Sequence, residues 1–320
     1  MNRVSEIDAT REDEAARAGW LYYVGGLTQD QIAAELGVSR QRAQRLVSRA
    51  VSEGLVRVRI EHKISACLEL EAALRRRFNL QTVRVAPSLG QGGDAARATA
   101  PLAATVLERI LARPEPQVIA FGTGRSLSAM VEEVMQPPAN AHKILSLIGN
   151  IAPDGSASFY DVIMRMADKL HLPHYPMLVP VISETAEERA MFDRLKPVQA
   201  VRRLAAMADA TFVGVGQLGD DAPVYKDGFV NLAELRGLQE AGAVGELVGA
   251  FYDSQGRYIT TPTTERFGSY KVARNRDAPM IGIAAGASKL AAIRGALAGG
   301  LINGLVTDEE TARSLCEEYI

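Results

Sequence analysis

Cysteine, long apolar runs and net charge are all scarce in this sequence. Its two cysteines, Cys67 and Cys316, are far apart and lack the spacing of a metal or redox site, which predicts a reduced, cytoplasmic protein. No stretch reaches the roughly 18 uninterrupted apolar residues that span a bilayer, and the N-terminal segment is charged throughout, so we expect neither a membrane partner nor a secretory signal. The formal net charge of −2 excludes a globally basic nucleic-acid coat protein but not a local basic patch.

A length of 320 residues fits two domains better than one. Hydrophobic residues make up 47% of the chain and charged residues 23%, which is the ordinary mix of a folded protein. The pattern along the chain predicts an N-terminal domain of short helices over residues 1–63, an amphipathic linker helix over 64–78, and a large domain of alternating strands and helices over 79–320.

Three helices are predicted in the N-terminal domain. The first covers Ala15–Tyr23 and follows a polar segment that we expect to be frayed. Thr28 and Gln31 form a capping-box pattern that begins the second helix, and Gly37 ends it. Ser39 caps the third helix, which buries four residues at positions i, i+3, i+4 and i+7, namely Ala43, Leu46, Val47 and Ala50.

The opposite side of the third helix carries the chemistry of base recognition. Gln41, Arg45 and Ser48 lie there, and arginine and glutamine make bidentate contacts to guanine and adenine edges. Two helices joined by a tight glycine turn, with the second helix in a major groove, form a helix-turn-helix. Flanking arginines suit phosphates. The predicted DNA-binding residues are Thr28, Gln29, Ser39, Arg40, Gln41, Arg42, Gln44, Arg45, Ser48 and Arg49.

A basic segment surrounds and follows this helix. From Arg40 to Lys63 there are seven basic residues against two acids, and Leu55–Ile60 alternates apolar and basic residues as an exposed strand or wing would. The alternative is a solvated surface helix. A surface helix does not account for two helix caps, a turn glycine and a basic wing that follow one another in this order. We therefore expect a winged-type helix-turn-helix domain that binds double-stranded DNA.

In the C-terminal domain, short β-branched segments alternate with helices. Several of them run directly into a glycine-rich loop and then a helix, an order typical of an α/β fold with a doubly wound, mainly parallel sheet. Ligands of such sheets bind at the carboxyl ends of the strands. The predicted strands are Thr82–Ala86, Val118–Phe121, Ile144–Ile148, Thr211–Val215 and Met280–Ala284.

The loop Gly122–Ser126 is the first candidate for a ligand site. It lies between a predicted strand and a predicted helix, where glycines let the backbone approach an anion and helix N-terminal amides can hold a phosphate. An ordinary turn between strand and helix explains the same residues equally well. The loop is neither a Walker loop, since no Gly-Lys-Ser/Thr follows, nor a Rossmann fingerprint, since the glycine spacing differs.

Three ordered motifs in the C-terminal third carry a resemblance to a known family. They are GAVGELVGAFYDSQG at 242–256, IGIAAGASKLAAIRGAL at 281–297 and LINGLVTD at 301–308. Together with the 122–126 loop and the helix-turn-helix, they make nearly the whole chain similar to the SorC family of sugar-responsive bacterial transcription regulators. The resemblance implies a sensor domain of the ribose-5-phosphate isomerase and glucosamine-6-phosphate deaminase type, a sugar, polyol or sugar-phosphate effector, and a homo-oligomer, usually a tetramer, on DNA.

The resemblance also implies residue roles. It assigns Thr123, Gly124 and Ser126 to the phosphate end of a pocket. It assigns Glu246 to an acidic position that can accept hydrogen bonds from hydroxyls, and Lys289 to a basic position for an anion. The segment 146–158 departs from many relatives, which leaves the identity and phosphorylation of the effector open. The predicted effector-binding residues are Gly122, Thr123, Gly124, Arg125, Ser126, Asn150, Glu246 and Lys289.

Other functions are weighed on their own residues. A sugar-phosphate isomerase or deaminase with an added DNA-binding domain is the main alternative, and Asp220 and Asp221 could supply its carboxylate base, although a solvated loop pair is the simpler interpretation. His171 and His174 flank a proline in a predicted loop without a cysteine, so we expect no metal and no cofactor. Trp20 is expected to pack in the core of the first helix, with no role in base stacking.

Overall fold

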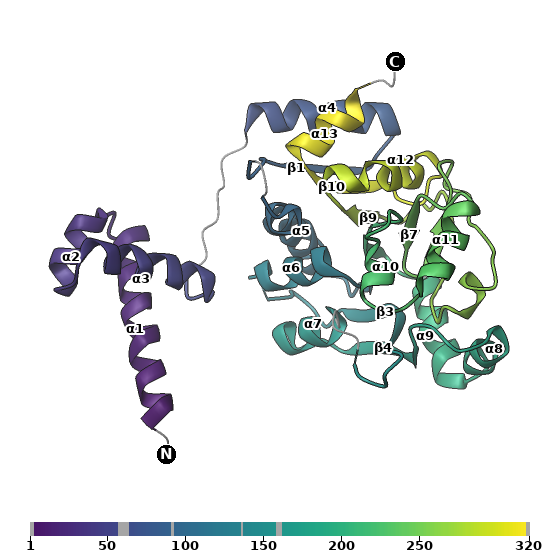
Figure 1. Ribbon diagram of the computed structural model, residues 1–320, viewed down its shortest axis with the longest axis horizontal. Helices are drawn as coiled ribbons and strands as arrows, with labels where there is room; N and C mark the ends of the chain where they lie inside the picture. The colour runs from purple at the N-terminus through teal and green to yellow at the C-terminus, as the bar shows by residue number, and fades with distance from the viewer. Residues whose placement is uncertain (1–2, 57–63, 91–92, 136, 158–161, 318–320) are drawn as a thin grey trace. The chain divides into compact units, whose positions relative to one another are not determined.

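The computed structural model describes residues 3–56, 64–90, 93–135, 137–157 and 162–317 (Figure 1). The chain divides into two compact units, Met1–His62 and Lys63–Ile320. No described helix is long and apolar enough to cross a membrane.

The first unit is built from three helices, α1 (Arg3–Tyr23), α2 (Gln29–Leu36) and α3 (Arg40–Ser52). Thr28 accepts a hydrogen bond from the Gln31 amide and forms a capping box with it, and Ser39 accepts one from the Arg42 amide at the start of α3. These caps satisfy amides that a helix start leaves unpaired. The small core contains the four residues of α3 that the sequence predicts to be buried, together with residues of α1 and α2. Its members are Ala15, Ala18, Ile32, Ala33, Ala43, Leu46, Val47 and Ala50.

Two sequence-based expectations for the first helix are wrong. Helix α1 begins at Arg3, so much of the segment expected to be frayed is helical. The Trp20 side chain is 65% exposed, because Ala15 and Ala18 occupy the face of α1 that meets the core. Of the predicted wing at Leu55–Ile60, the part from residue 57 onward lies outside the described residues.

The second unit contains a seven-stranded parallel sheet in the order β1-β10-β9-β5-β2-β3-β4 and a three-stranded antiparallel sheet in the order β6-β7-β8. The strands are β1 (Thr82–Ala86), β2 (Val118–Phe121), β3 (Lys143–Ile151), β4 (His174–Pro180), β5 (Ala210–Gly214), β6 (Gly216–Gln217), β7 (Gly245–Leu247), β8 (Ala250–Tyr252), β9 (Met280–Ile283) and β10 (Gly304–Asp308).

Helices cover both faces of the parallel sheet (Figure 1). On β2, Ile119 and Phe121 belong to the core beneath α5, α6 and α7, whereas Ala120 belongs to the core beneath α4, α9, α11, α12 and α13. The helices are α4 (Ser65–Phe78), α5 (Ala95–Leu111), α6 (Arg125–Glu133), α7 (Val162–Leu170), α8 (Ala186–Asp193), α9 (Lys196–Ala206), α10 (Pro223–Lys226), α11 (Leu232–Glu240), α12 (Leu290–Ala298) and α13 (Glu309–Cys316).

The doubly wound α/β fold predicted from the sequence is confirmed. All five predicted strands are present with small shifts at their ends, whereas β4, β10 and the antiparallel sheet were not predicted. His174 begins β4, so its predicted place in a loop is wrong, while His171 lies in the preceding turn. Among the described residues, no group of three or more histidine, cysteine, aspartate or glutamate residues could hold a metal ion.

The sheet changes winding direction between β2 and β5. From β2 the chain proceeds outward to β3 and β4, whereas from β5 it proceeds in the opposite direction to β9 and β10. The loops after β2 and β5 therefore separate and leave a crevice at the carboxyl ends of these strands. Phe121 and Phe212, the rings of the two strands, stack with centroids 5.6 Å apart and support this edge of the sheet.

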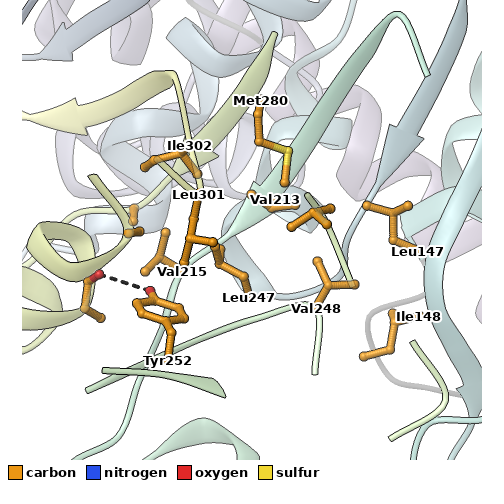
Figure 2. Close-up of a cluster of buried hydrophobic side chains, with 14 of the residues drawn as sticks. Leu147, Ile148, Val213, Val215, Leu247, Val248, Tyr252, Met280, Leu301 and Ile302 are labelled. Atoms are coloured by element: carbon orange, nitrogen blue, oxygen red, sulfur yellow. Dashed lines mark hydrogen bonds between the residues drawn. The ribbon is translucent and has the colours of Figure 1, made fainter. Parts of the chain in front are cut away.

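The antiparallel sheet packs on the core that contains Ala120. Leu247, Phe251 and Tyr252 are buried in this core, and the Tyr252 hydroxyl donates a hydrogen bond of 3.0 Å to the Ala292 carbonyl oxygen (Figure 2). This bond satisfies the one polar atom of a fully buried ring and attaches β8 to α12. The hairpin of β7 and β8 thereby has a defined position beside the crevice.

Candidate functional site

The outward side of α3 divides into two groups of residues. Arg40, Arg42 and Arg49 form ion pairs within the first unit, with Asp30 at 3.4 Å, Glu14 at 2.8 Å and Glu53 at 2.7 Å. Arg45 donates to the Gln41 carbonyl oxygen of its own helix at 3.3 Å. The side chains of Gln41, Gln44, Arg45 and Ser48 are exposed, which is the arrangement that contact with base edges requires.

The remaining predicted DNA-binding residues lie at the starts of the two helices. Thr28 and Ser39 are the N-caps of α2 and α3, and Gln29 is the first residue of α2. The structure therefore gives Thr28 and Ser39 a structural task whether or not they also contact a phosphate.

A second candidate site is a pocket of about 170 Å³ at the carboxyl ends of β2 and β5, which we call the switch-point pocket. Its volume suits a small ligand, since pockets for drug-sized ligands have about 300–1,000 Å³. The lining residues are Thr123, Gly124, Arg125, Ser126, Ile148, Val181, Gly214, Val215, Gly216, Pro223, Val224, Asp227, Phe229, Glu246, Val248, Gly249, Phe267 and Lys289.

One end of the pocket is the start of α6. Gly124 is its N-cap with φ of 118°, a backbone conformation that residues with a Cβ rarely adopt, and it offers no side chain to cap the first amides. Ser126, in the first turn, is buried and lines the pocket. A helix N-terminus of this kind attracts an anion through its amides and its dipole.

Two ionisable side chains from distant segments complete the polar lining. Glu246 comes from β7 and accepts a hydrogen bond from the Gly249 amide, whereas Lys289 ends the short 3₁₀ turn Ala287–Lys289 before α12. At the pocket mouth, the Arg125 guanidinium lies 3.6 Å from the Asp227 carboxylate. The Lys289 ammonium is close enough to Glu246 and Asp94 to be influenced by both carboxylates.

Burial shifts the protonation of both groups. It raises the pKa of Glu246 to about 7, against the opposing effects of the Gly249 amide and Lys289. It also lowers the pKa of Lys289, an effect that Arg125 reinforces and that Glu246 and Asp94 oppose. Near neutral pH the Glu246 carboxyl is therefore partly protonated, and a carboxylic acid can both donate to and accept from a hydroxyl group.

Comparison with known proteins assigns the two units. Residues 62–317 match the sugar-binding domain family, and residues 18–62 match the MarR family. The erythritol catabolism regulatory protein EryD of Brucella abortus (strain 2308) is 34% identical over 301 residues, which cover 94% of this chain and 95% of EryD.

The full-length sorbitol operon regulator SorC from Klebsiella pneumoniae has a similar structure. The TM-score is 0.70 at 28% identity, with 96% of this chain and 99% of SorC covered. This chain belongs to the SorC family of sugar-responsive transcription regulators. The transcriptional regulator LsrR of Escherichia coli (strain K12), 30% identical over 317 residues that cover 98% of this chain and 97% of LsrR, agrees with that assignment. The protein is a transcription regulator with a helix-turn-helix and a sugar-binding domain.

Most of the predicted effector-binding residues meet in one place. Thr123, Gly124, Arg125, Ser126, Glu246 and Lys289 line the switch-point pocket, although nearly 170 positions separate the first from the last in the sequence. Gly122 and Asn150 do not line it. Gly122 lies behind the pocket wall, against Val213 and Val248, and Asn150 lies near the end of β3.

Several lining residues were missed from the sequence. Asp227 and Phe229 come from the loop after α10, and Phe267 follows a 3₁₀ turn, so neither a helical nor a strand period marks them. Asp220 and Asp221, which were considered as a catalytic pair, are exposed and do not line the pocket. Instead Asp221 accepts a hydrogen bond of 2.8 Å from Gln217 and lies 4.0 Å from Lys226.

Proposed function

We propose that this regulator controls an operon for the catabolism of a sugar or polyol and that a phosphorylated sugar or polyol binds in the switch-point pocket as its effector. The observation that carries the proposal is the pairing of two binding chemistries in one small cavity. The start of α6 and Lys289 suit a phosphate, and Glu246 suits hydroxyl groups. A bare anion would make no contact that requires Glu246, and an unphosphorylated polyol would make no contact that requires the charge of Lys289.

The names of the relatives support a polyol. EryD is named for erythritol catabolism, and SorC for the sorbitol operon. The apolar wall formed by residues such as Val215 and Phe267 suits the carbon backbone of a short chain.

The effector is tested by a thermal-shift screen in which each four- to six-carbon sugar and polyol is used both free and as its monophosphate. A ligand that binds only the folded chain raises its stability, by about 2.7 kcal/mol at a concentration 100 times the Kd. We expect at least one phosphate ester to raise the melting temperature and to change operator affinity, with a much smaller effect of its free form. Equal effects of the free and phosphorylated forms would overturn the assignment of the anion end.

The DNA-binding role of α3 is proposed from its exposed side chains. Gln41, Arg45 and Ser48 would contact base edges, while the arginines held in ion pairs would contact phosphates after exchanging partners. Such a regulator acts where the bacterial chromosome is, in the cytoplasm. DNase footprinting of the intergenic region beside the gene tests this role, and protection of a palindromic or repeated sequence is expected.

A homo-oligomer, by resemblance a tetramer, is proposed as the DNA-binding form. One helix-turn-helix covers little DNA, and specific sites usually comprise two half-sites about one helical turn apart. Leu68 on α4 and Ile64, the residue just before it, are each 39% exposed, whereas the other side of α4 packs against α13 and β1. The outward side of α4 therefore offers apolar surface to a second copy. Light scattering that shows a monomer at micromolar concentration, with and without operator, would overturn this proposal.

The isomerase or deaminase alternative is tested on the same compounds. Asp220 and Asp221 lie outside the pocket lining, and the named relatives are regulators, so we propose that the site binds its ligand without converting it. Incubation with pentose and hexosamine phosphates should leave them unchanged. Turnover at about one per second or faster, as enzymes show, would contradict the proposal.

A further inference from the structure

Four non-glycine residues in the described parts of the chain have positive φ, namely Asn79, His171, Val248 and Asn275. Asparagine and histidine are the residue types that enter this left-handed region with the least difficulty. Val248, with φ of 53°, differs from the other three because its branched Cβ collides with the backbone in that region. Such outliers persist only where the surrounding structure imposes them, and they concentrate at functional sites.

Val248 and Gly249 form the two-residue loop of the β7–β8 hairpin. Their φ values of 53° and 72° are both positive, as a type I′ turn requires. Asparagine or glycine followed by glycine is the usual choice for this turn, because neither suffers from the positive φ. The hairpin alone would therefore favour asparagine or glycine at position 248, and a valine there needs another reason.

That reason lies in the position of its side chain. Val248 is only 5% exposed and lines the switch-point pocket. A Cβ added to Gly122 would lie 3.4 Å from Cγ2 of Val248 and 3.5 Å from Cγ1 of Val213, so both valines lie close to the backbone just after β2. Figure 2 shows Val248 beside Val213, with Ile148 on the other side. The isopropyl group is thus part of the apolar lining of the pocket near the end of β2.

We infer that Val248 is a specificity-determining residue, whose isopropyl group limits the length of the carbon chain that the pocket accepts. This inference rests on the proposed effector site and adds to it the residue that selects ligand size. The left-handed turn presents the side chain to the cavity, and neither asparagine nor glycine at this position would supply an apolar wall of the same volume. Gly249, the other residue of this turn, also lines the pocket but has no side chain, so Val248 alone gives the turn an apolar group there.

The backbone part of the inference is tested on the ligand-free protein with two variants, Val248→Ala and Val248→Gly. Both remove the isopropyl group, but alanine keeps the cost of a positive φ and glycine removes it. The same pair at Val181, a buried pocket residue that is not among those with positive φ, is the matched control. At position 248 we expect the glycine variant to melt above the alanine variant, and at position 181 the reverse. If the alanine variant melted above the glycine variant at both positions, the inference would be overturned.

The selectivity part is tested with a matched series of linear polyol phosphates, erythritol 4-phosphate, ribitol 5-phosphate and sorbitol 6-phosphate. Calorimetric Kd values are measured for the unaltered chain, Val248→Gly and Val181→Ala. We expect Val248→Gly to improve the affinity for a longer member relative to a shorter one by about tenfold or more, since one methylene in a fitted pocket is worth roughly 10–200-fold. Val181→Ala should change this ratio much less.

The outcomes separate the two proposals. Binding with an unchanged ratio in Val248→Gly would overturn the role of Val248 and leave the effector site intact. An equal change of ratio in Val181→Ala would also overturn it, because enlarging any wall would then suffice. Failure of every phosphate to bind either protein would overturn the proposed effector class, and the selectivity of Val248 with it.

Discussion

The two units of the molecule place their functional residues in opposite ways. In the first unit, the proposed DNA-binding residues fall within 22 consecutive positions, Thr28–Arg49, on two short helices and their caps. In the second unit, the pocket draws on segments spread from Thr123 to Lys289, among them the start of α6, the β7–β8 hairpin and the turn before α12. A helix face can be recognised from its periodicity, whereas a crevice at a sheet edge exists only after distant strands have paired.

The two units also differ in how deeply their charged side chains are buried. The arginines of α3 are exposed or lie in exposed ion pairs, and such pairs contribute little to stability and exchange partners readily. Glu246 and Lys289 lie in a pocket where burial shifts the pKa of each. We therefore expect each substitution on α3 to weaken DNA binding only partly. Substitution of Glu246 or Lys289 should instead abolish the response to effector.

The largest effect is expected for Lys289→Ala and Glu246→Gln. Each should raise the effector concentration at half-maximal response by about 30-fold or more, because losing one partner of a buried charged contact costs about 2–5 kcal/mol. Operator affinity without effector should remain near that of the unaltered chain. Fluorescence anisotropy of labelled operator, titrated with effector, measures both quantities, and a normal response in both variants would show that the effector binds elsewhere.

Arg45→Ala should have the next largest effect, about 1–3 kcal/mol in operator affinity, together with relaxed base preference. Arg49→Ala is the matched comparison on the same helix. Arg49 forms an ion pair with Glu53 and lies beside the residues proposed to contact bases. Its loss should therefore weaken the affinity for all DNA sequences alike. Competition binding against operators with single base changes separates the two effects. Unchanged affinity and preference in Arg45→Ala would show that another side of α3 contacts the bases.

Ser39→Ala should destabilise the DNA-binding unit by about 1 kcal/mol, because it removes the hydroxyl group that accepts a hydrogen bond from the backbone amide of Arg42 at the start of α3. Ser48→Ala, on the exposed side of the same helix, is the control for stability and should change it by less than about 0.5 kcal/mol. Urea denaturation followed by far-UV circular dichroism gives both values. Equal effects of the two variants would mean that the Ser39 cap does not stabilise α3.

A change in the pH dependence of stability is expected in Glu246→Gln. Because the pKa of Glu246 rises from 4.5 to about 7 on folding, the folded state binds this proton more tightly, and stability declines as pH rises from 4.5 through 7. Glutamine removes that decline. The melting temperature of the variant should therefore gain on that of the unaltered chain by a few degrees between pH 5 and 7.5 and then level off. Parallel curves across this range would contradict the burial of an ionisable Glu246.

Local sequence patterns predicted much of the fold. The caps Thr28 and Ser39, the buried row of α3 and five of the parallel strands follow from local hydrogen bonding and side-chain periodicity. Errors arose where the environment decides. Trp20 has the apolar ring of a core residue, but its position on α1 faces away from the small core. Strand β4 has two prolines in its seven residues, Pro176 and Pro180, which argue against a central strand and are tolerated because β4 lies at the sheet edge.

The sequence by itself determined the helix-turn-helix, the order of strand-loop-helix units and the glycine-rich loop before α6, because each depends on contacts between residues a few positions apart. Only the tertiary structure decided that Glu246 and Lys289 share a pocket with that loop, that Gly122 and Asn150 do not line it, and that Val248 lines it from a turn with positive φ. Parallel pairing brings strands from the whole domain to one edge, and burial there shifts the pKa of Glu246 and Lys289. Neither effect has a local signature in the sequence.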